Sequence, residues 1–212
     1  MLKWVLGCLL LCGIASTAAY ADTIGPNCST CGGVVYTLTY APGGAPSNGT
    51  QWYDFTVKVD TTGINVATAQ VLTALALKAP AGTSGVQLIS APVSGGWTLT
   101  PGGTNSGGCK YSTTNGFDCA QATATSTGTG SGFGVPTGAN DIYTFAFGFL
   151  LPAGTSGPIG SDIKAVYDTK SGSFGGLQMS PGGVIASPVP EPQTLGLLAL
   201  GLLVILPLLK RR

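Results

Sequence analysis

The sequence predicts an all-β fold, an antiparallel β-sandwich of the Ig-like or jelly-roll-like kind, within a chain of 212 residues. Three observations predict it. The 34 Gly and 14 Pro residues separate short apolar or alternating runs, which is typical of strands joined by turns. These runs recur at intervals of roughly 8–15 residues, too close together for the helical crossovers of a βαβ fold. The clearest run, 51–60, alternates strictly and places Tyr53, Phe55, Val57 and Val59 on one face.

Taken in chain order, the predicted strands cover residues 33–41, 51–60, 71–79, 86–90, 97–100, 117–125, 142–151, 162–167 and 172–179. The Leu and Ala content of 71–79 also allows a helix. Thr68 before it, Thr73 within it and Pro80 after it favour a strand. An aromatic stripe at period two indicates a buried sheet face, so we expect a core containing Trp97, Phe145, Phe147 and Phe149. Flexible Gly/Ser/Thr-rich loops are expected at 101–108 and 126–138.

The first residues of the chain predict a secretory signal peptide. Lys3 gives a positive start, an apolar centre follows, and Ala19-Tyr20-Ala21 ends the segment in an A-x-A pattern, so cleavage is expected after Ala21. Two cysteines in the apolar centre leave a lipoprotein signal as the alternative, which their flanking residues disfavour. The predicted order is a signal peptide (1–21), an ectodomain (22–180), a Pro/Gly linker (181–189) and a C-terminal tail (190–212).

Four cysteines remain after this cleavage: Cys28, Cys31, Cys109 and Cys119. An even number of cysteines in an oxidising compartment predicts disulfides. Of the three pairings, we favour Cys28–Cys31 with Cys109–Cys119, because the members of each pair are close in sequence and Gly/Asn-rich residues let the chain turn. A redox CxxC site is less favoured, since no helical pattern follows Cys31. A metal site is also less favoured, because the spacing fits zinc poorly.

The charged residues exclude several classes of function. The chain has no His, so a Ser-His-Asp triad and His metal ligands are excluded, and we expect neither a metal nor a cofactor. Between Asp22 and Val189 there are five Lys, no Arg and seven Asp, so no basic patch is available for nucleic acid. A glycosidase would need two carboxyl groups about 5–9 Å apart. Asp54 and Asp60 share one run, but both are better explained as turn and solvent-face residues.

The C-terminal run from Leu195 to Leu209 contains no charged or polar side chain. It is slightly shorter than the roughly 20 residues that a membrane-spanning helix prefers, and it is followed at once by Lys210, Arg211 and Arg212. A basic cluster beside a membrane span stays in the cytoplasm. The sequence therefore predicts a single C-terminal transmembrane helix with a cytoplasmic basic end. A buried core helix is the alternative, but it would have to be apolar on every face and end in three cations.

Just before this run lies Pro190-Glu191-Pro192. Proline and glutamate are also common where a helix begins, so the motif by itself could be only a helix start. The order of Pro-Glu-Pro, apolar span and basic end nevertheless resembles the PEP-CTERM sorting domain over residues 188–212. The resemblance implies recognition by exosortase, a membrane-embedded cysteine protease or transpeptidase, with cleavage near the motif. It also implies a Gram-negative bacterium that makes exopolysaccharide, and delivery to its cell surface or extracellular matrix.

We therefore expect an exported, non-catalytic surface or matrix protein with a structural or adhesive role linked to exopolysaccharide and biofilm. It passes the inner membrane, is held there transiently by its C-terminal helix, and has exosortase, the membrane and exopolysaccharide as its partners. A carbohydrate-binding module is the alternative, and requires at least two coplanar exposed aromatic residues among Trp52, Tyr40, Tyr111 and Trp97. A His-independent glycosidase is less favoured.

Overall fold

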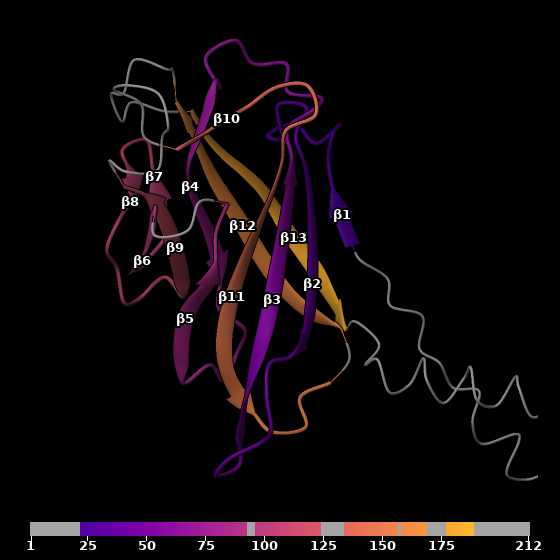
Figure 1. Cartoon of the computed structure of the whole chain (residues 1–212), viewed down its shortest axis with the longest axis vertical. Coiled ribbons are helices and arrows are strands. Elements are labelled where there is room, and N and C mark those ends of the chain that lie inside the picture. Colours follow the sequence, from indigo (N-terminus) through magenta and orange to yellow (C-terminus); the bar gives the residue numbers. More distant parts are fainter. Residues whose placement is uncertain (1–21, 93–95, 124–133, 157, 169–176, 189–212) are drawn as a thin grey trace, which may run out of the picture.

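A computed structural model of the chain describes residues 22–92, 96–123, 134–156, 158–168 and 177–188 (Figure 1). Within these residues there are strands and no helix, so the predicted all-β fold is confirmed. The strands are β1 (Asp22–Ile24), β2 (Val35–Pro42), β3 (Thr50–Asp60), β4 (Val71–Lys78), β5 (Gly85–Ser90), β6 (Trp97–Pro101), β7 (Thr104–Asn105), β8 (Gly108–Cys109), β9 (Phe117–Ala122), β10 (Val135–Pro136), β11 (Ile142–Pro152), β12 (Ile159–Asp168) and β13 (Leu177–Pro188).

Eleven of these strands form one continuous hydrogen-bonded sheet. Its order is β5-β11-β3-β2-β13-β12-β4-β9-β6, with β1 paired to β2 and β10 paired to β4. All of the pairings are antiparallel except that of β13 with β2, which is parallel and joins Ser187 to Thr39 and Pro188 to Tyr40. This short parallel pairing connects the β5-β11-β3-β2 half of the sheet to the β12-β4-β9-β6 half.

The alternation predicted for 51–60 is present in β3. Tyr53, Phe55, Val57 and Val59 are buried, while the residues between them lie on the other face. β2 and β11 pair with β3 on its two edges and bring their own alternate residues to the same side. Period-two patterning fixes this register, because a slip by one residue would turn the apolar side chains out to solvent.

Side chains from both halves of the sheet belong to one apolar core. The halves overlap in Figure 1, where β11, β3 and β2 run side by side and β12 passes behind them. Phe145 of β11 packs edge-on against Trp97 of β6, with ring centroids 4.9 Å apart. The hydroxyls of Tyr36 on β2 and Tyr167 on β12 lie 2.7 Å apart and are fully buried. This hydrogen bond satisfies two polar groups inside the core and ties the two halves together.

A second, smaller apolar cluster lies outside this core. It contains Ala74, Ala76, Cys119, Val166, Phe117 and, partly buried, Cys109.

The expectation of a loop at 101–108 is corrected by the structure. Part of this segment is the β7–β8 hairpin, in which Thr104 pairs with Cys109. Gln178 of β13 donates hydrogen bonds to the carbonyl and hydroxyl of Thr104, at 3.2 and 3.1 Å. Likewise, the expected loop 126–138 contains β10, while its residues 126–133 lie outside the described part.

The expectation of a linker at 181–189 is also corrected, because β13 continues to Pro188. Gly182 and Gly183 pair with Ile163 and Asp162 of β12. The register between the strands shifts near Ala165, which leaves Pro181 at a bulge. Proline cannot donate to a ladder but is tolerated at bulges, so Pro-Gly-Gly here is compatible with a strand.

Candidate functional site

The predicted sorting residues follow directly on the last described strand. Pro190, Glu191 and Pro192, the span from Leu195 to Leu209, and the basic end Lys210, Arg211 and Arg212 lie outside the described residues, as do Ala19 and Ala21 of the predicted cleavage site. Among the described residues, none forms a helix with the length and apolar character needed to cross a membrane.

The structure does show where the tail is attached to the folded domain. Pro188 pairs with Tyr40 on the edge of β2 that β3 leaves free. Asp22, the first residue after the predicted cleavage, pairs with Leu38 on the same edge. Both ends of the described chain therefore meet along one edge of β2. Only Val189 separates Pro188 from the Pro-Glu-Pro motif, so the motif is joined to the folded domain almost without a spacer.

The four cysteines form two disulfides, Cys28–Cys31 and Cys109–Cys119. These are the pairings that their spacing favours. The first lies in the turn between β1 and β2, where the amide of Val34 donates to the carbonyl of Cys31 at 3.0 Å. The second joins β8 to β9, and the amide of Cys109 donates to Gln121 Oε1 at 3.0 Å. All four sulfurs are engaged, which removes the thiolates that a zinc site or a reactive thiol would need.

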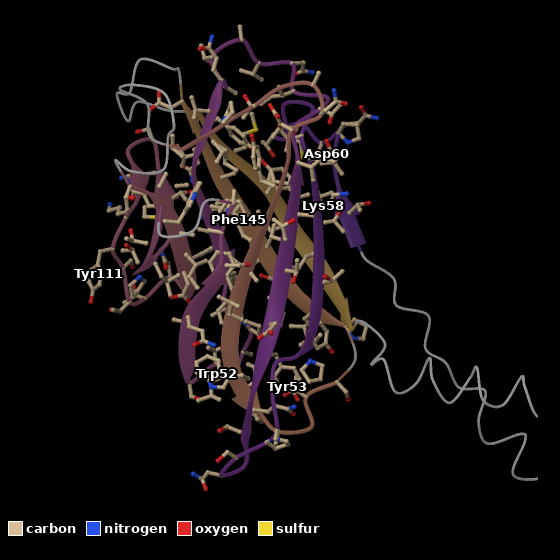
Figure 2. All side chains as sticks on the ribbon, in the orientation of Figure 1. Trp52, Tyr53, Lys58, Asp60, Tyr111 and Phe145 are labelled. Carbon is tan, nitrogen blue, oxygen red and sulfur yellow. A yellow bond between two sulfur atoms is a disulfide. The ribbon has the colours of Figure 1, made fainter. Side chains whose placement is uncertain are left out.

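The aromatic residues considered for a sugar-binding platform do not lie together. Tyr40 and Trp97 are in the core, with 2% and 7% of their surface exposed. Tyr111 is 68% exposed in the segment between β8 and β9, whereas Trp52 is partly buried on β3. Figure 2 shows these two side chains at separate places on the molecule. A platform built from two or more of these four residues is therefore not formed by the described fold.

Asp54 and Asp60 do not form a pair of catalytic carboxylates. Both project from the outer face of β3, six positions apart, which corresponds to about 20 Å along a strand. Their environments also differ. Asp60 accepts hydrogen bonds from Thr62, including one of 3.0 Å from its amide, and these hold the pKa of Asp60 below its usual value. Partial burial instead raises the pKa of the Asp54 carboxyl.

Three side chains on the outer face of β3 and β5 lie closer together than Asp54 and Asp60 do. We call them the outer-face cluster: Trp52, Asp54 and Gln87. Across the strands, Gly148 of β11 pairs with Asp54 on one side and Gln87 on the other. A Cβ atom at Gly148 would lie 2.8 Å from Cγ and 2.9 Å from Nε2 of Gln87, so the Gln87 side chain lies directly over this glycine. Sequence reasoning placed Trp52 and Asp54 on one face but missed Gln87, since the β5–β11 pairing was not predictable.

Asp118 offers a test of the electrostatics of the domain. It is 7% exposed on β9, and burial raises the pKa of its carboxyl. An acid with a raised pKa in the folded state binds protons more tightly there than in the unfolded chain. The protonated Asp118 carboxyl therefore stabilises the fold at low pH. This contribution is lost as the pH rises from the unfolded pKa of about 3.9 through the folded pKa. We expect Asp118→Asn to raise the melting temperature at pH 7 by a few degrees and to leave it almost unchanged near pH 3.

Thermal unfolding followed by circular dichroism across this pH range measures the effect. Asp162→Asn is the matched control, because Asp162 is an exposed residue paired with Lys78 at 3.2 Å, and such surface pairs contribute little. A melting temperature for Asp118→Asn that is lower than that of the wild type at pH 7 would contradict the prediction.

The chain has a β-domain that is joined almost directly to a Pro-Glu-Pro motif, an apolar run and a basic end. This organisation defines a class of proteins, in which a folded domain carries a C-terminal sorting tail. Residues 188–212 match the family model described as the PEP-CTERM protein-sorting motif. The resemblance read from the tail is thus confirmed over this range. The motif implies an exported protein that exosortase sorts toward the cell surface. A comparison with curated protein sequences found no match for the chain.

Proposed function

We propose that this chain is a non-catalytic surface or extracellular-matrix protein of a Gram-negative bacterium, with a structural or adhesive role linked to exopolysaccharide. A signal peptide directs it through the inner membrane. The helix from Leu195 to Leu209 then holds it there, with the basic end in the cytoplasm, until exosortase cleaves near Pro-Glu-Pro. The observation that carries the proposal is the match of residues 188–212 to the sorting motif, at the end of a folded domain.

The composition of the domain supports a non-catalytic role. The chain has no His, and the two Asp residues of β3 are about 20 Å apart along the strand. Within the described ranges, no three or more His, Cys, Asp or Glu residues lie close enough together to hold a metal ion. We also propose that the two halves of the continuous sheet are the layers of a sandwich, which is supported by the single core that contains side chains from both halves.

The attachment of the tail supports processing at the membrane surface. Seven residues lead from Pro188 to Leu195, and an extended chain of this length spans at most about 25 Å. The end of β13 and its partner strand β2 must therefore stay close to the membrane as long as the tail is intact. Exosortase would meet the motif directly beside the folded domain, and cleavage there would leave β13 and its pairing with β2 in the product.

Replacement of the motif tests this proposal. Glu191→Ala combined with Pro192→Ala should leave the chain in the membrane fraction at its full C-terminal length, because the protease no longer recognises it. The wild type should be recovered outside the membrane as a form that starts at Asp22, ends near residue 190 and carries two disulfides. Intact-mass spectrometry of the membrane fraction and the culture medium measures both ends of each form.

The matched control is Gln193→Ala with Thr194→Ala, which changes the two residues next to the motif and should be released like the wild type. Release of the Glu191/Pro192 double variant at the wild-type level would refute processing through the motif. A wild type that ends at Arg212 in every fraction would refute cleavage altogether.

A further inference from the structure

We propose that the outer-face cluster of Trp52, Asp54 and Gln87 is a binding site for a neutral glycan. This inference rests on the proposed function for the class of ligand, and it places the contact on the β3–β11–β5 part of the sheet. In this arrangement the Trp52 indole stacks against one pyranose ring. Asp54 accepts hydrogen bonds from the hydroxyls of the neighbouring sugar, and Gln87 both donates and accepts them.

The position of Trp52 suits stacking. Its partner across the strands is Leu150 of β11, and its ring extends over that residue toward β5, since a Cβ atom at Gly85 would lie 3.5 Å from Trp52 Cη2. The indole is thus supported by Leu150 and by the bare backbone of Gly85 while the residue stays partly exposed. An indole held against a sheet presents an apolar plate, and the C–H face of a sugar ring is apolar enough to pack on it.

Small residues are the cross-strand neighbours of Asp54 on this face. Gly148 lies between Asp54 and Gln87, and Ala41 of β2 is the other cross-strand neighbour of Asp54. A Cβ atom at Gly43 would collide with the Asp54 carboxylate, so this carboxylate lies directly against Gly43. With strands about 4.8 Å apart, the backbones of Asp54 and Gln87 are separated by about 10 Å, and the Gln87 side chain reaches over Gly148 toward Asp54, so one sugar ring can contact both side chains.

The polar groups of the cluster are not used within the described part of the protein. Neither the Asp54 carboxylate nor the Gln87 amide has a hydrogen bond or ion pair with any described residue. By contrast, Asp60 is bonded to Thr62 and Asp162 to Lys78. A half-buried carboxylate without a partner is costly unless a ligand or water donates to it. Sugar hydroxyls are suitable donors, and a carboxylate at the site excludes acidic sugars by charge repulsion.

Direct binding measurements test the site. The full-length protein in detergent and the released form, where it is obtained, are titrated with three hexasaccharides, of glucose, N-acetylglucosamine and galacturonic acid. We expect at least one of the two neutral chains to bind and the acidic chain to bind more weakly. Trp52→Ala should raise the Kd about tenfold or more, and Asp54→Asn and Gln87→Ala about three- to tenfold each.

The matched control is Tyr111→Ala, which removes an exposed aromatic residue from a different surface and should bind like the wild type. Gln87 is exposed, so Gln87→Ala tests the site even if Trp52→Ala fails to fold. The proposal is overturned if neither neutral chain binds, if the acidic chain binds best, or if the Gln87 and Asp54 variants bind like the wild type. Because binding is measured apart from processing, a released protein that binds no glycan refutes this site and leaves the sorting function intact.

Discussion

Phe55→Ala should destabilise the domain by about 3–5 kcal/mol, the range measured when a buried Phe is truncated to Ala. Phe55 is fully buried at the centre of β3, between Tyr40 of β2 and Phe147 of β11. Its ring stacks on Tyr40 and meets Phe149 edge-on, with centroids 5.2 Å apart in both cases. Alanine would leave a cavity that these neighbours fill only in part, and both ring contacts would be lost. Most domains are stable by only about 5–15 kcal/mol, so the loss is a large share of the total.

Urea unfolding of the purified protein, followed by tryptophan fluorescence, measures this effect as a lower midpoint with an unchanged slope. Thr56→Ala is the matched control, since Thr56 is the next residue on the same strand and projects from the opposite face. It should cost less than about 1 kcal/mol. In cells, Phe55→Ala should reduce the amount exported, because the unfolded chain is degraded. Equal midpoints for the two variants would show that this stripe is not the core of the domain.

The stripe in β3 also shows how far the sequence predicts this fold. Alternation needs only one face to be buried, so β3 and the aromatic run of β11 could be predicted from the residues alone. The Leu/Ala-rich β4 does not alternate, and its sequence also allowed a helix. The strand preference at 71–79 is confirmed because β4 has sheet partners on both edges, β12 and β9, and is buried over seven of its eight residues.

The elements that the sequence did not predict depend on distant contacts. β1 has three residues and gains its structure from pairing with β2. The β7–β8 hairpin has no apolar alternation and is held by a disulfide and by Gln178. Only the start of β13, residues 177–179, falls within a predicted strand, and its continuation passes through a Pro-Gly-Gly stretch that is tolerated because a bulge lies there. The outer-face cluster could not be predicted for the same reason, since Gln87 joins it only through the β5–β11 register.

Cys109→Ala combined with Cys119→Ala should cost about 2–4 kcal/mol on the chain-entropy argument. The bond joins residues ten positions apart and fixes the β7–β8 hairpin against β9. Both cysteines belong to the second apolar cluster, to which the β7–β8 hairpin contributes only the partly buried Cys109. Since hydrophobic stabilisation scales with the area buried, this cluster alone is a weak anchor for the hairpin, and we expect the disulfide to supply much of what holds it.

The matched control is Cys28→Ala with Cys31→Ala, which opens a ring between residues only three positions apart. It should cost less, about 1–2 kcal/mol, because the entropy term grows with the logarithm of the loop length. Urea midpoints compare the two variants, and limited proteolysis locates the change, with new cleavage expected at 110–116 only when the Cys109–Cys119 bond is missing. Equal losses of stability, or the same proteolytic pattern in both variants, would mean that the hairpin is held by Gln178 and the apolar cluster rather than by the disulfide.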